Sequence, residues 1–182
     1  MISFFTSFDT IVLQYFASIR TIVGSYMFIW ISEFGSVFVI LGIALIVGLL
    51  LLIKRRFAEA AGLALAVGGS GIVVEVLKWV IARPRPDRAF AAYIEMGGSF
   101  PSSHAAESVA LYGFLAFLFI RLSPRTLRNR IITDILILLP CIIAFGRLYL
   151  GVHYVSDVVV GMVIGGVFLA GGVMLTWKMS KT

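Results

Sequence analysis

GSVFVILGIALIVGLLLLI, residues 35–53, is the stretch of this sequence that decides the fold, because it contains no charged residue. An apolar run of roughly 20 residues is long enough for an α-helix to cross the hydrocarbon core of a bilayer. A second charge-free run covers residues 158–177. The sequence therefore predicts a membrane protein and not a water-soluble domain.

The composition of the whole chain supports this prediction. Of the 182 residues, 60% are hydrophobic and only 13% are charged, and the mean hydropathy of +1.06 is far above that of soluble domains. No linker, low-complexity tract or internal repeat divides the chain, so we expect one membrane-embedded domain over residues 1–182. The single cysteine, Cys141, lies in an apolar run, which excludes a disulfide framework and a cysteine metal site.

Three further runs have the length of a membrane span, with polar residues mainly at their ends. We therefore predict an all-α polytopic transmembrane bundle with spans at about residues 35–53, 57–80, 104–120, 131–150 and 156–177. Residues 1–34 are apolar and rich in aromatic residues, but Asp9, Arg20 and Glu33 interrupt them. We interpret this segment as an interfacial helix. The alternative is a sixth span, which would move the N-terminus to the cytoplasm.

Basic residues indicate the orientation of the spans. Five alternating spans place three basic clusters on one side of the membrane: residues 54–56, residues 121–130 and the C-terminal tail. By the positive-inside rule this side is cytoplasmic. The sequence thus predicts a multi-pass protein of the cytoplasmic (inner) membrane, with the loop 83–101 and the turn 149–156 facing outward.

The outward side nevertheless carries a basic group of its own. Its members are Lys78, Arg83, Arg85, Arg88 and Arg147. Because topology disfavours basic residues there, an anionic ligand is the better explanation for them. The net charge of +6 is therefore explained by topology and anion binding, and no nucleic-acid partner is expected.

Three short segments at the outward ends of the spans carry the side chains most useful for chemistry. They are Lys78-(six residues)-Arg85-Pro86, Pro101-Ser102-Ser103-His104, and Gly146-Arg147-(five residues)-His153-(three residues)-Asp157. The first closes the second span, the second opens the third span, and the last joins the fourth span to the fifth. We expect them to converge on one cavity at the outer membrane surface.

The second and third segments contain both histidines of the chain, His104 and His153. His153 and Asp157 are spaced i, i+4, so a helix starting near His153 would let the carboxylate accept the ring N–H and fix the tautomer. The other ring nitrogen could then attack a phosphorus atom to form a phosphohistidine. His104 could protonate the leaving oxygen and later activate water. For either histidine alone, an interfacial anchor or helix cap is an equal alternative.

The remaining residues of the segments suit a phosphate. Phosphoryl transfer needs positioning and positive charge around the equatorial oxygens, which Lys78, Arg85 and Arg147 offer without a metal ion or other cofactor. Ser102 and Ser103 open the third span, where free backbone N–H groups and a hydroxyl can hold a phosphate. The alternative interpretation of Ser102 is an ordinary N-cap, and that of Lys78 is a lysine reaching toward the interface from a helix end.

The prolines of Arg83-Pro84-Arg85-Pro86 end the second span, because each removes a backbone donor and disfavours α geometry in the preceding residue. This turn is expected to bring Arg85 over the mouth of the bundle and to leave Arg83 and Arg88 as rim charges for acidic headgroups. Glu75, three residues before Lys78, is expected to pair with it. Glu107 either orients His104 or is a solvated carboxylate.

In this order and spacing, the three segments resemble the signature motifs of the type 2 phosphatidic acid phosphatase (PAP2) family of integral-membrane lipid phosphatases. The family pattern is Lys-(six)-Arg-Pro, Pro-Ser-Gly-His and Ser-Arg-(five)-His-(three)-Asp. Ser103 replaces the motif glycine and Gly146 the motif serine. The resemblance implies phosphate binding by Lys78, Arg85 and Arg147, a hydrogen bond from Ser102, and catalysis by His104 as acid, His153 as nucleophile and Asp157 as its partner.

The resemblance implies hydrolysis of a lipid phosphate or pyrophosphate at the outer membrane face. The substrate classes are phosphatidic acid, phosphatidylglycerol phosphate, undecaprenyl pyrophosphate and lipid A. One alternative is a lipid phosphotransferase that uses the same site. Another is a non-catalytic lipid-binding or transport protein, which predicts loss of a histidine, whereas both are present. The expected partners are the lipid substrate and membrane lipids, with no obligatory protein partner.

Overall fold

Every regular element in residues 2–181, the part of the chain that the computed structural model describes, is a helix. Side chains are described from residue 7 onward, and the two ends of the predicted domain, residues 1 and 182, lie outside the described residues. Five segments are long and apolar enough to cross a membrane. Large apolar side chains such as Phe38 and Trp79 are exposed on their outer faces, as helices surrounded by lipid require. The predicted all-α transmembrane bundle is confirmed.

Four of the five candidate spans are close to the predicted ranges, whereas the first begins at Ile22 and not at residue 35, so it includes part of the segment predicted to be interfacial. The first combines α2 (Ile22–Glu33) with α3 (Val37–Ile53), and the second combines α4 (Phe57–Ala64), the π-helical turn η1 (Leu65–Gly69) and α5 (Ser70–Ile81). The last three are α6 (Ser103–Leu122), α7 (Leu127–Tyr149) and α8 (Val155–Met179). Outside them lie α1 (Ile2–Ile19) and the 3₁₀ turn η2 (Arg88–Phe90).

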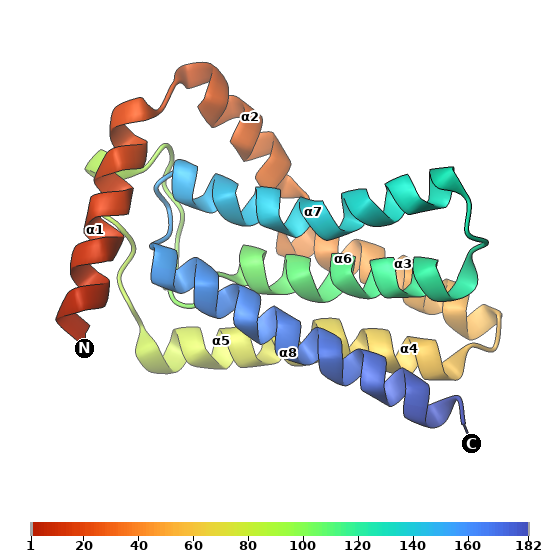
Figure 1. Cartoon of the computed structure of the whole chain (residues 1–182). Helices are drawn as coiled ribbons and strands as arrows, with labels where there is room; N and C mark the ends of the chain where they lie inside the picture. Colours follow the sequence, from red (N-terminus) through yellow and green to blue (C-terminus); the bar gives the residue numbers. More distant parts are fainter. Residues whose placement is uncertain (1, 182) are drawn as a thin grey trace.

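The predicted interfacial segment, residues 1–34, contains two helices in the structure. The break follows from Thr21, whose hydroxyl accepts a hydrogen bond from Gly24 N and caps α2. Arg20 fixes the corner by donating to the carbonyls of Tyr149 at 2.9 Å and Phe90 at 2.6 Å. As a result α1 lies across one end of the bundle, steeply inclined to the spans, while α2 continues toward α3 (Figure 1).

The two ends of the bundle differ in what they carry. One end holds α1, the loop that leads from α5 to α6, and the short turn between α7 and α8 (Figure 1). The other end holds the α3–α4 and α6–α7 connections and the C-terminus. All three sequence motifs fall at the first end, and the basic clusters used to assign topology fall at the second.

Small residues bring α8 close to α6, which is the most buried helix of the bundle. A β-carbon on Gly161 would lie 2.6 Å from the carbonyl oxygen of Ser102 and 3.2 Å from the β-carbon of Ala105. Close packing of this kind matters in a bilayer, where lipid tails are as apolar as leucine and helices gain little from burying apolar surface. The contact places the first turn of α8 beside the first turn of α6.

A second close approach, between α4 and α8, lies toward the other end of the bundle. A β-carbon on Gly62 would lie 2.6 Å from the carbonyl oxygen of Gly172 and 2.8 Å from Cζ of Phe114. The backbone of α8 cannot move away from this contact without disturbing its contact with α6. Gly62 is therefore needed for packing.

We expect Gly62→Ala to lower the thermal stability of the detergent-solubilised protein, because over-packing a tight contact typically costs ~1–3 kcal/mol. The matched control is Gly42→Ala in α3, where no described atom beyond the adjacent turns of the helix itself lies within 4 Å of the added β-carbon. The measurement is the melting temperature of both variants. Equal melting temperatures would contradict the packing argument.

Candidate active site

The end of α5 carries the first cation of the site. Lys78 donates from Nζ to the hydroxyl of Ser103 at 3.0 Å, and Nζ also lies 3.6 Å from a carboxylate oxygen of Glu75, the partner expected for it. The helix ends because Ala82 adopts a left-handed conformation with φ of 46°. This turn directs the proline-rich segment over the end of the bundle, as the prolines predicted.

The first turn of α6 presents serine and histidine side chains. Ser102 is the N-cap and accepts a hydrogen bond from Ala105 N, while its own backbone N–H donates to the carbonyl of Asp157 at 3.0 Å. His104 follows one residue into the helix. Its Nδ1 atom is buried and has no hydrogen-bond partner among the described residues. His104 lies within electrostatic reach of His153, Lys78, Arg85 and Arg147.

His153 and Asp157 lie at the start of α8 but not on a shared helical face. The helix begins at Val155 with Tyr154 as N-cap, so His153 precedes it, whereas the spacing argument started the helix near His153. Oδ2 of Asp157 accepts from Tyr154 N at 2.9 Å and lies 3.5 Å from Nδ1 of His153. The pair is close enough to interact electrostatically, although the distance is longer than an ordinary hydrogen bond.

The other ring nitrogen of His153 faces the cations. Arg85 Nη1 lies 3.2 Å from Nε2 of His153. A guanidinium can only donate, so Nε2 accepts and the ring proton is assigned to Nδ1, on the side of Asp157. Burial lowers the pKa of His153 well below its usual value, and the positive charges of Arg147 and Arg85 lower it further. The imidazole is therefore neutral at neutral pH, as a nucleophile requires.

Arg85 and Arg147 converge on a carboxylate that the sequence analysis did not single out. Glu95 Oε2 pairs with Arg147, and Glu95 Oε1 lies 3.3 Å from Arg85 Nη2. Burial opposes ionisation of Glu95, but the charges of Arg147 and Arg85 outweigh it and hold the pKa of this carboxyl below its usual value. Arg147 also donates to the hydroxyl of Tyr93 at 2.6 Å. Glu95 thus holds together the two guanidinium groups predicted to bind phosphate.

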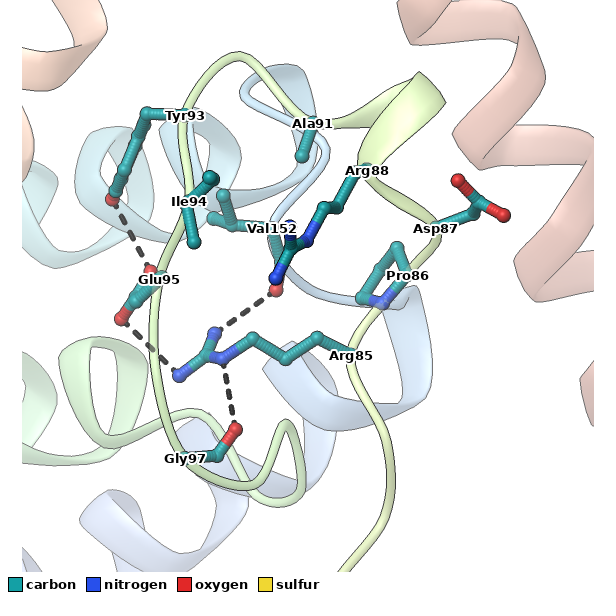
Figure 2. A pocket seen from close by; sticks show the side chains of 10 residues that line it. All are labelled: Arg85, Pro86, Asp87, Arg88, Ala91, Tyr93, Ile94, Glu95, Gly97 and Val152. Carbon is teal, nitrogen blue, oxygen red and sulfur yellow. Dashed lines mark hydrogen bonds and ion pairs between the residues drawn. The ribbon is translucent and has the colours of Figure 1, made fainter.

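Carbonyl groups of the same loop fix the orientation of Arg85. It donates to the carbonyl oxygens of Val152 at 3.1 Å, Met96 at 3.1 Å and Gly97 at 3.2 Å. A cavity of about 480 Å³ opens beside it, lined among others by Arg88 and Glu95 (Figure 2). That volume lies within the range of small-molecule sites. Arg88 is exposed at its wall, as expected of a rim charge.

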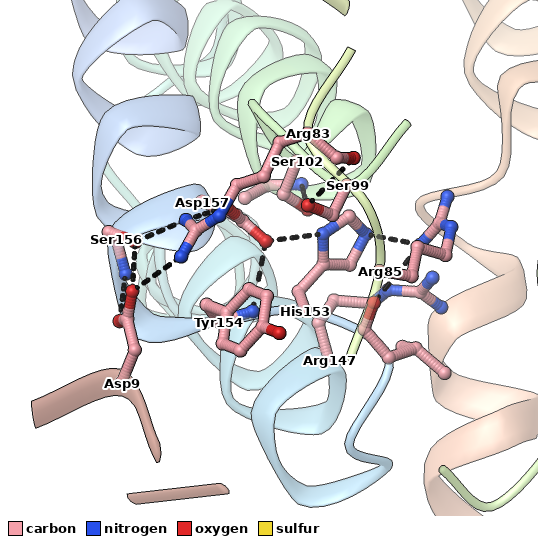
Figure 3. Close-up of polar contacts among 12 residues, drawn as sticks. Asp9, Arg83, Arg85, Ser99, Ser102, Arg147, His153, Tyr154, Ser156 and Asp157 are labelled. Atoms are coloured by element: carbon pink, nitrogen blue, oxygen red, sulfur yellow. Dashed lines mark hydrogen bonds and ion pairs between the residues drawn. The ribbon is translucent and has the colours of Figure 1, made fainter. Parts of the chain in front are cut away.

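Arg83 does not lie at the rim, which corrects the expectation from sequence. Its Nη1 atom donates to Asp157 Oδ1 at 2.6 Å, and its Nη2 atom donates to Asp9 Oδ2 at 2.9 Å (Figure 3). The guanidinium also stacks over the ring of Tyr154, 4.1 Å from the centroid. The physical reason is that buried carboxylates at the start of α8 attract the nearest guanidinium.

The structure brings all the predicted site residues to one end of the bundle. Glu107 is buried one turn after His104, within electrostatic reach of Lys78, and has no contact with His104 that would orient it.

Sequence reasoning missed three residues of the site: Asp9, Tyr93 and Glu95. Asp9 could have been found from the sequence, since a charged residue within an apolar membrane segment marks function more often than not. Tyr93 and Glu95 lie in an irregular loop without a sequence pattern, so no sequence signal pointed to them.

Both departures from the family pattern have a structural counterpart. Ser103, in place of glycine, supplies the hydroxyl that Lys78 binds. Gly146, in place of serine, packs against an aromatic ring, since a β-carbon there would lie 3.0 Å from Cδ1 of Phe28. The missing hydroxyl therefore leaves room for α2 against α7.

Comparison with known proteins places this geometry in a family. A sequence model of the PAP2 superfamily matches residues 59–181. Phosphatidylglycerophosphatase B of Bacillus subtilis (strain 168) is 28% identical over 136 residues, covering 74% of this chain and 66% of that protein. Lipid A 4'-phosphatase of Bacteroides thetaiotaomicron is 29% identical over 189 residues, covering 91% of this chain and 76% of that protein. The chain thus spans just under two thirds of the first relative's length.

Solved structures share the fold. The crystal structure of a transmembrane PAP2 type phosphatidylglycerolphosphate phosphatase from Bacillus subtilis superposes with a TM-score of 0.82 at 25% identity, covering 97% of this chain and 86% of that chain. The crystal structure of LpxE from Aquifex aeolicus gives a TM-score of 0.65 at 24% identity, covering 90% and 91%. The arrangement of helices described above is therefore a known one.

We expect Glu95→Gln to strengthen binding of inorganic phosphate, because it removes the carboxylate that competes for Arg85 and Arg147. Charge-assisted hydrogen bonds contribute ~1.5–3 kcal/mol, so the inhibition constant of phosphate should fall by about 10-fold or more. The control is Asp87→Asn, an exposed carboxylate of the same loop that caps η2. Unchanged or weaker phosphate binding in Glu95→Gln alone would contradict this role.

Proposed function

The chain belongs to the PAP2 superfamily, and on this premise we propose that it is a membrane lipid phosphatase that works through a phosphohistidine on His153. The observation that carries the proposal is the convergence of Lys78, Arg85 and Arg147 on the two histidines at one end of the bundle. Three fixed cations around a neutral, buried imidazole suit an anion that must be attacked by a nitrogen.

In the first step, Nε2 of His153 attacks the phosphorus atom and the bond from phosphorus to the lipid oxygen breaks. His104 donates a proton to that oxygen, so the lipid leaves as an alcohol or as a monophosphate. The ring of His153 becomes positively charged and keeps its Nδ1 proton toward Asp157. The carboxylate stabilises that charge without taking the proton, as in other carboxylate–histidine pairs.

In the second step, water replaces the lipid. His104, now neutral, accepts a proton from the water while the oxygen attacks phosphorus and the bond to Nε2 breaks. Inorganic phosphate forms, and His153 returns to its neutral state. In both steps the charge on the phosphoryl oxygens faces Lys78, Arg85, Arg147 and the N-terminus of α6, whose free N–H groups favour an anion.

We propose that the site faces the outside of the cytoplasmic membrane. The basic connections at the opposite end of the bundle support this orientation by the positive-inside rule. The substrate is a lipid monophosphate or pyrophosphate of the classes phosphatidylglycerol phosphate, phosphatidic acid, lipid A or undecaprenyl pyrophosphate. The names of the relatives support the first and third of these classes.

We expect His153→Ala to abolish turnover, because it removes Nε2, the nitrogen that faces Arg85 and forms the bond to phosphorus in the proposed mechanism. His104→Ala should still form a phosphoenzyme from an aryl phosphate, whose leaving group needs no proton, but should hydrolyse it slowly. The measurement is phosphate release together with acid-labile labelling from a ³²P-labelled substrate. Substantial activity in His153→Ala would overturn the mechanism.

We expect the purified protein to release inorganic phosphate from at least one of the four lipid classes without an added acceptor lipid. Each lipid is presented in the same detergent, so that differences in rate reflect recognition and not delivery. His153→Ala protein serves as the blank. Accumulation of a phosphorylated acceptor lipid without free phosphate would show a phosphotransferase instead.

A further inference from the structure

An acidic residue of the N-terminal helix reaches the candidate active site. Asp9 lies in α1, outside the three motif segments, and its side chain is only 1% exposed. A buried carboxylate needs hydrogen-bond donors or a cation to remain charged. Asp9 has both, and its side-chain partners among the described residues, Arg83 and Ser156, lie next to the Asp157–His153 pair (Figure 3).

Asp9 caps the helix on which Asp157 lies. Its Oδ1 accepts from the backbone N–H of Ser156 at 3.0 Å, and its Oδ2 accepts from the hydroxyl of Ser156 at 2.5 Å. Asp157 accepts from the N–H of Tyr154 in the same turn. Two carboxylates, from two distant parts of the sequence, therefore satisfy the free donors at one helix start, where negative charge is favoured.

A single guanidinium joins the two carboxylates. Arg83 gives one nitrogen to Asp157 and the other to Asp9, and the ring of Tyr154 covers it. Burial opposes the charge on Arg83, but hydrogen bonds and charges of Asp9 and Asp157 outweigh it and raise the pKa of this arginine. The cluster of two carboxylates and one cation keeps a net negative charge beside His153.

We propose that Asp9 is a positioning residue for the Asp157–His153 pair and that it acts through Arg83. By holding one nitrogen of Arg83, Asp9 prevents the guanidinium from turning wholly onto Asp157. The Oδ2 atom of Asp157 then stays negative and directed at Nδ1 of His153, where positive charge develops during attack. The inference rests on the proposed function, and it makes α1 a part of the site as well as an anchor at the membrane surface.

The charge balance of the first step explains why this arrangement affects the rate. Before attack, His153 is neutral, and the cluster carries one negative charge in excess. After attack, the ring is positive and pairs with that charge, while no proton moves to Asp157. Without Asp9 the excess disappears, so the positive ring of the phosphohistidine would meet a neutral Arg83–Asp157 pair. The rate constant of phosphorylation depends on this difference more than substrate binding does.

The test compares Asp9→Asn with the wild type. Asparagine has the shape of aspartate and can still accept from Ser156, but it carries no charge. We expect kcat to fall by about 10-fold or more, as for other residues that orient a catalytic group, with KM changed by less than about 2-fold. The matched control is Asp134→Asn, which removes an exposed carboxylate of α7 and should leave kcat unchanged.

Single-turnover kinetics separate positioning from folding. Partial misfolding of Asp9→Asn would lower the amplitude of phosphoenzyme formation and leave its rate constant unchanged, and this result would overturn the proposal. A lower rate constant at unchanged amplitude supports it. Unchanged kcat in Asp9→Asn would also overturn it.

A double-mutant cycle tests the route through Arg83. If Asp9 acts through this arginine, Asp9→Asn in an Arg83→Gln background should change kcat by less than about 2-fold, since coupled residues are not additive. If the fold-reductions in kcat of the two single substitutions multiply in the double variant, Asp9 acts by another route and the proposal is overturned. Failure of the proposed function is distinguishable, because the wild type would then release no phosphate from any lipid tested.

Discussion

The hydrogen bond from Ser102 N to the carbonyl of Asp157 joins the starts of α6 and α8, and the placement of both histidines depends on it. The bond forms because Gly161 has no side chain to separate the two helices. His104 then lies in the first turn of α6, His153 lies shortly before the start of α8, and the two histidines are within electrostatic reach of each other. Close packing at Gly161 and this hydrogen bond together fix the register of the two helices, as small residues and interhelical hydrogen bonds do in other membrane bundles.

Ion pairs hold the arginines of the site in place around the two histidines. The site concentrates Arg83, Arg85 and Arg147 where little water reaches them, and unpaired charges there would cost several kcal/mol each. Each guanidinium therefore has an acidic partner: Asp9 and Asp157 for Arg83, and Glu95 for the other two. The result is two separate clusters, one net negative behind His153 and one net positive in front of it. The imidazole of His153 lies between them. Its Nε2 atom can attack a phosphate held by the net positive cluster, while the net negative cluster beside Nδ1 stabilises the positive charge that forms on the ring.

The sequence predicted what the bilayer and the motif spacing dictate. Span positions follow from the thickness of the membrane, and Lys78, Arg85, Arg147 and the histidines follow from three fixed spacings at span ends. The remaining features depend on tertiary structure. The direction of Arg83 is set by the left-handed turn at Ala82, and the role of Asp9 depends on α1 lying across the bundle end. No local pattern records that Glu95, in an irregular loop, meets two arginines from other elements.

The position of Glu95 also bears on how an anion enters the site. Arg147 is fully buried and Arg85 is held by three carbonyl groups, so neither has to move far or lose water when a phosphate replaces the carboxylate. Under the proposed function, phosphate binding exchanges one anion for another on cations that folding has already desolvated and oriented. Such preorganised cations contribute more to a charged transition state than flexible ones, because little reorganisation accompanies the reaction. In this mechanism the carboxylate of Glu95 has to leave the two arginines when phosphate binds, so Glu95 affects both the charge of the site and its affinity for anions.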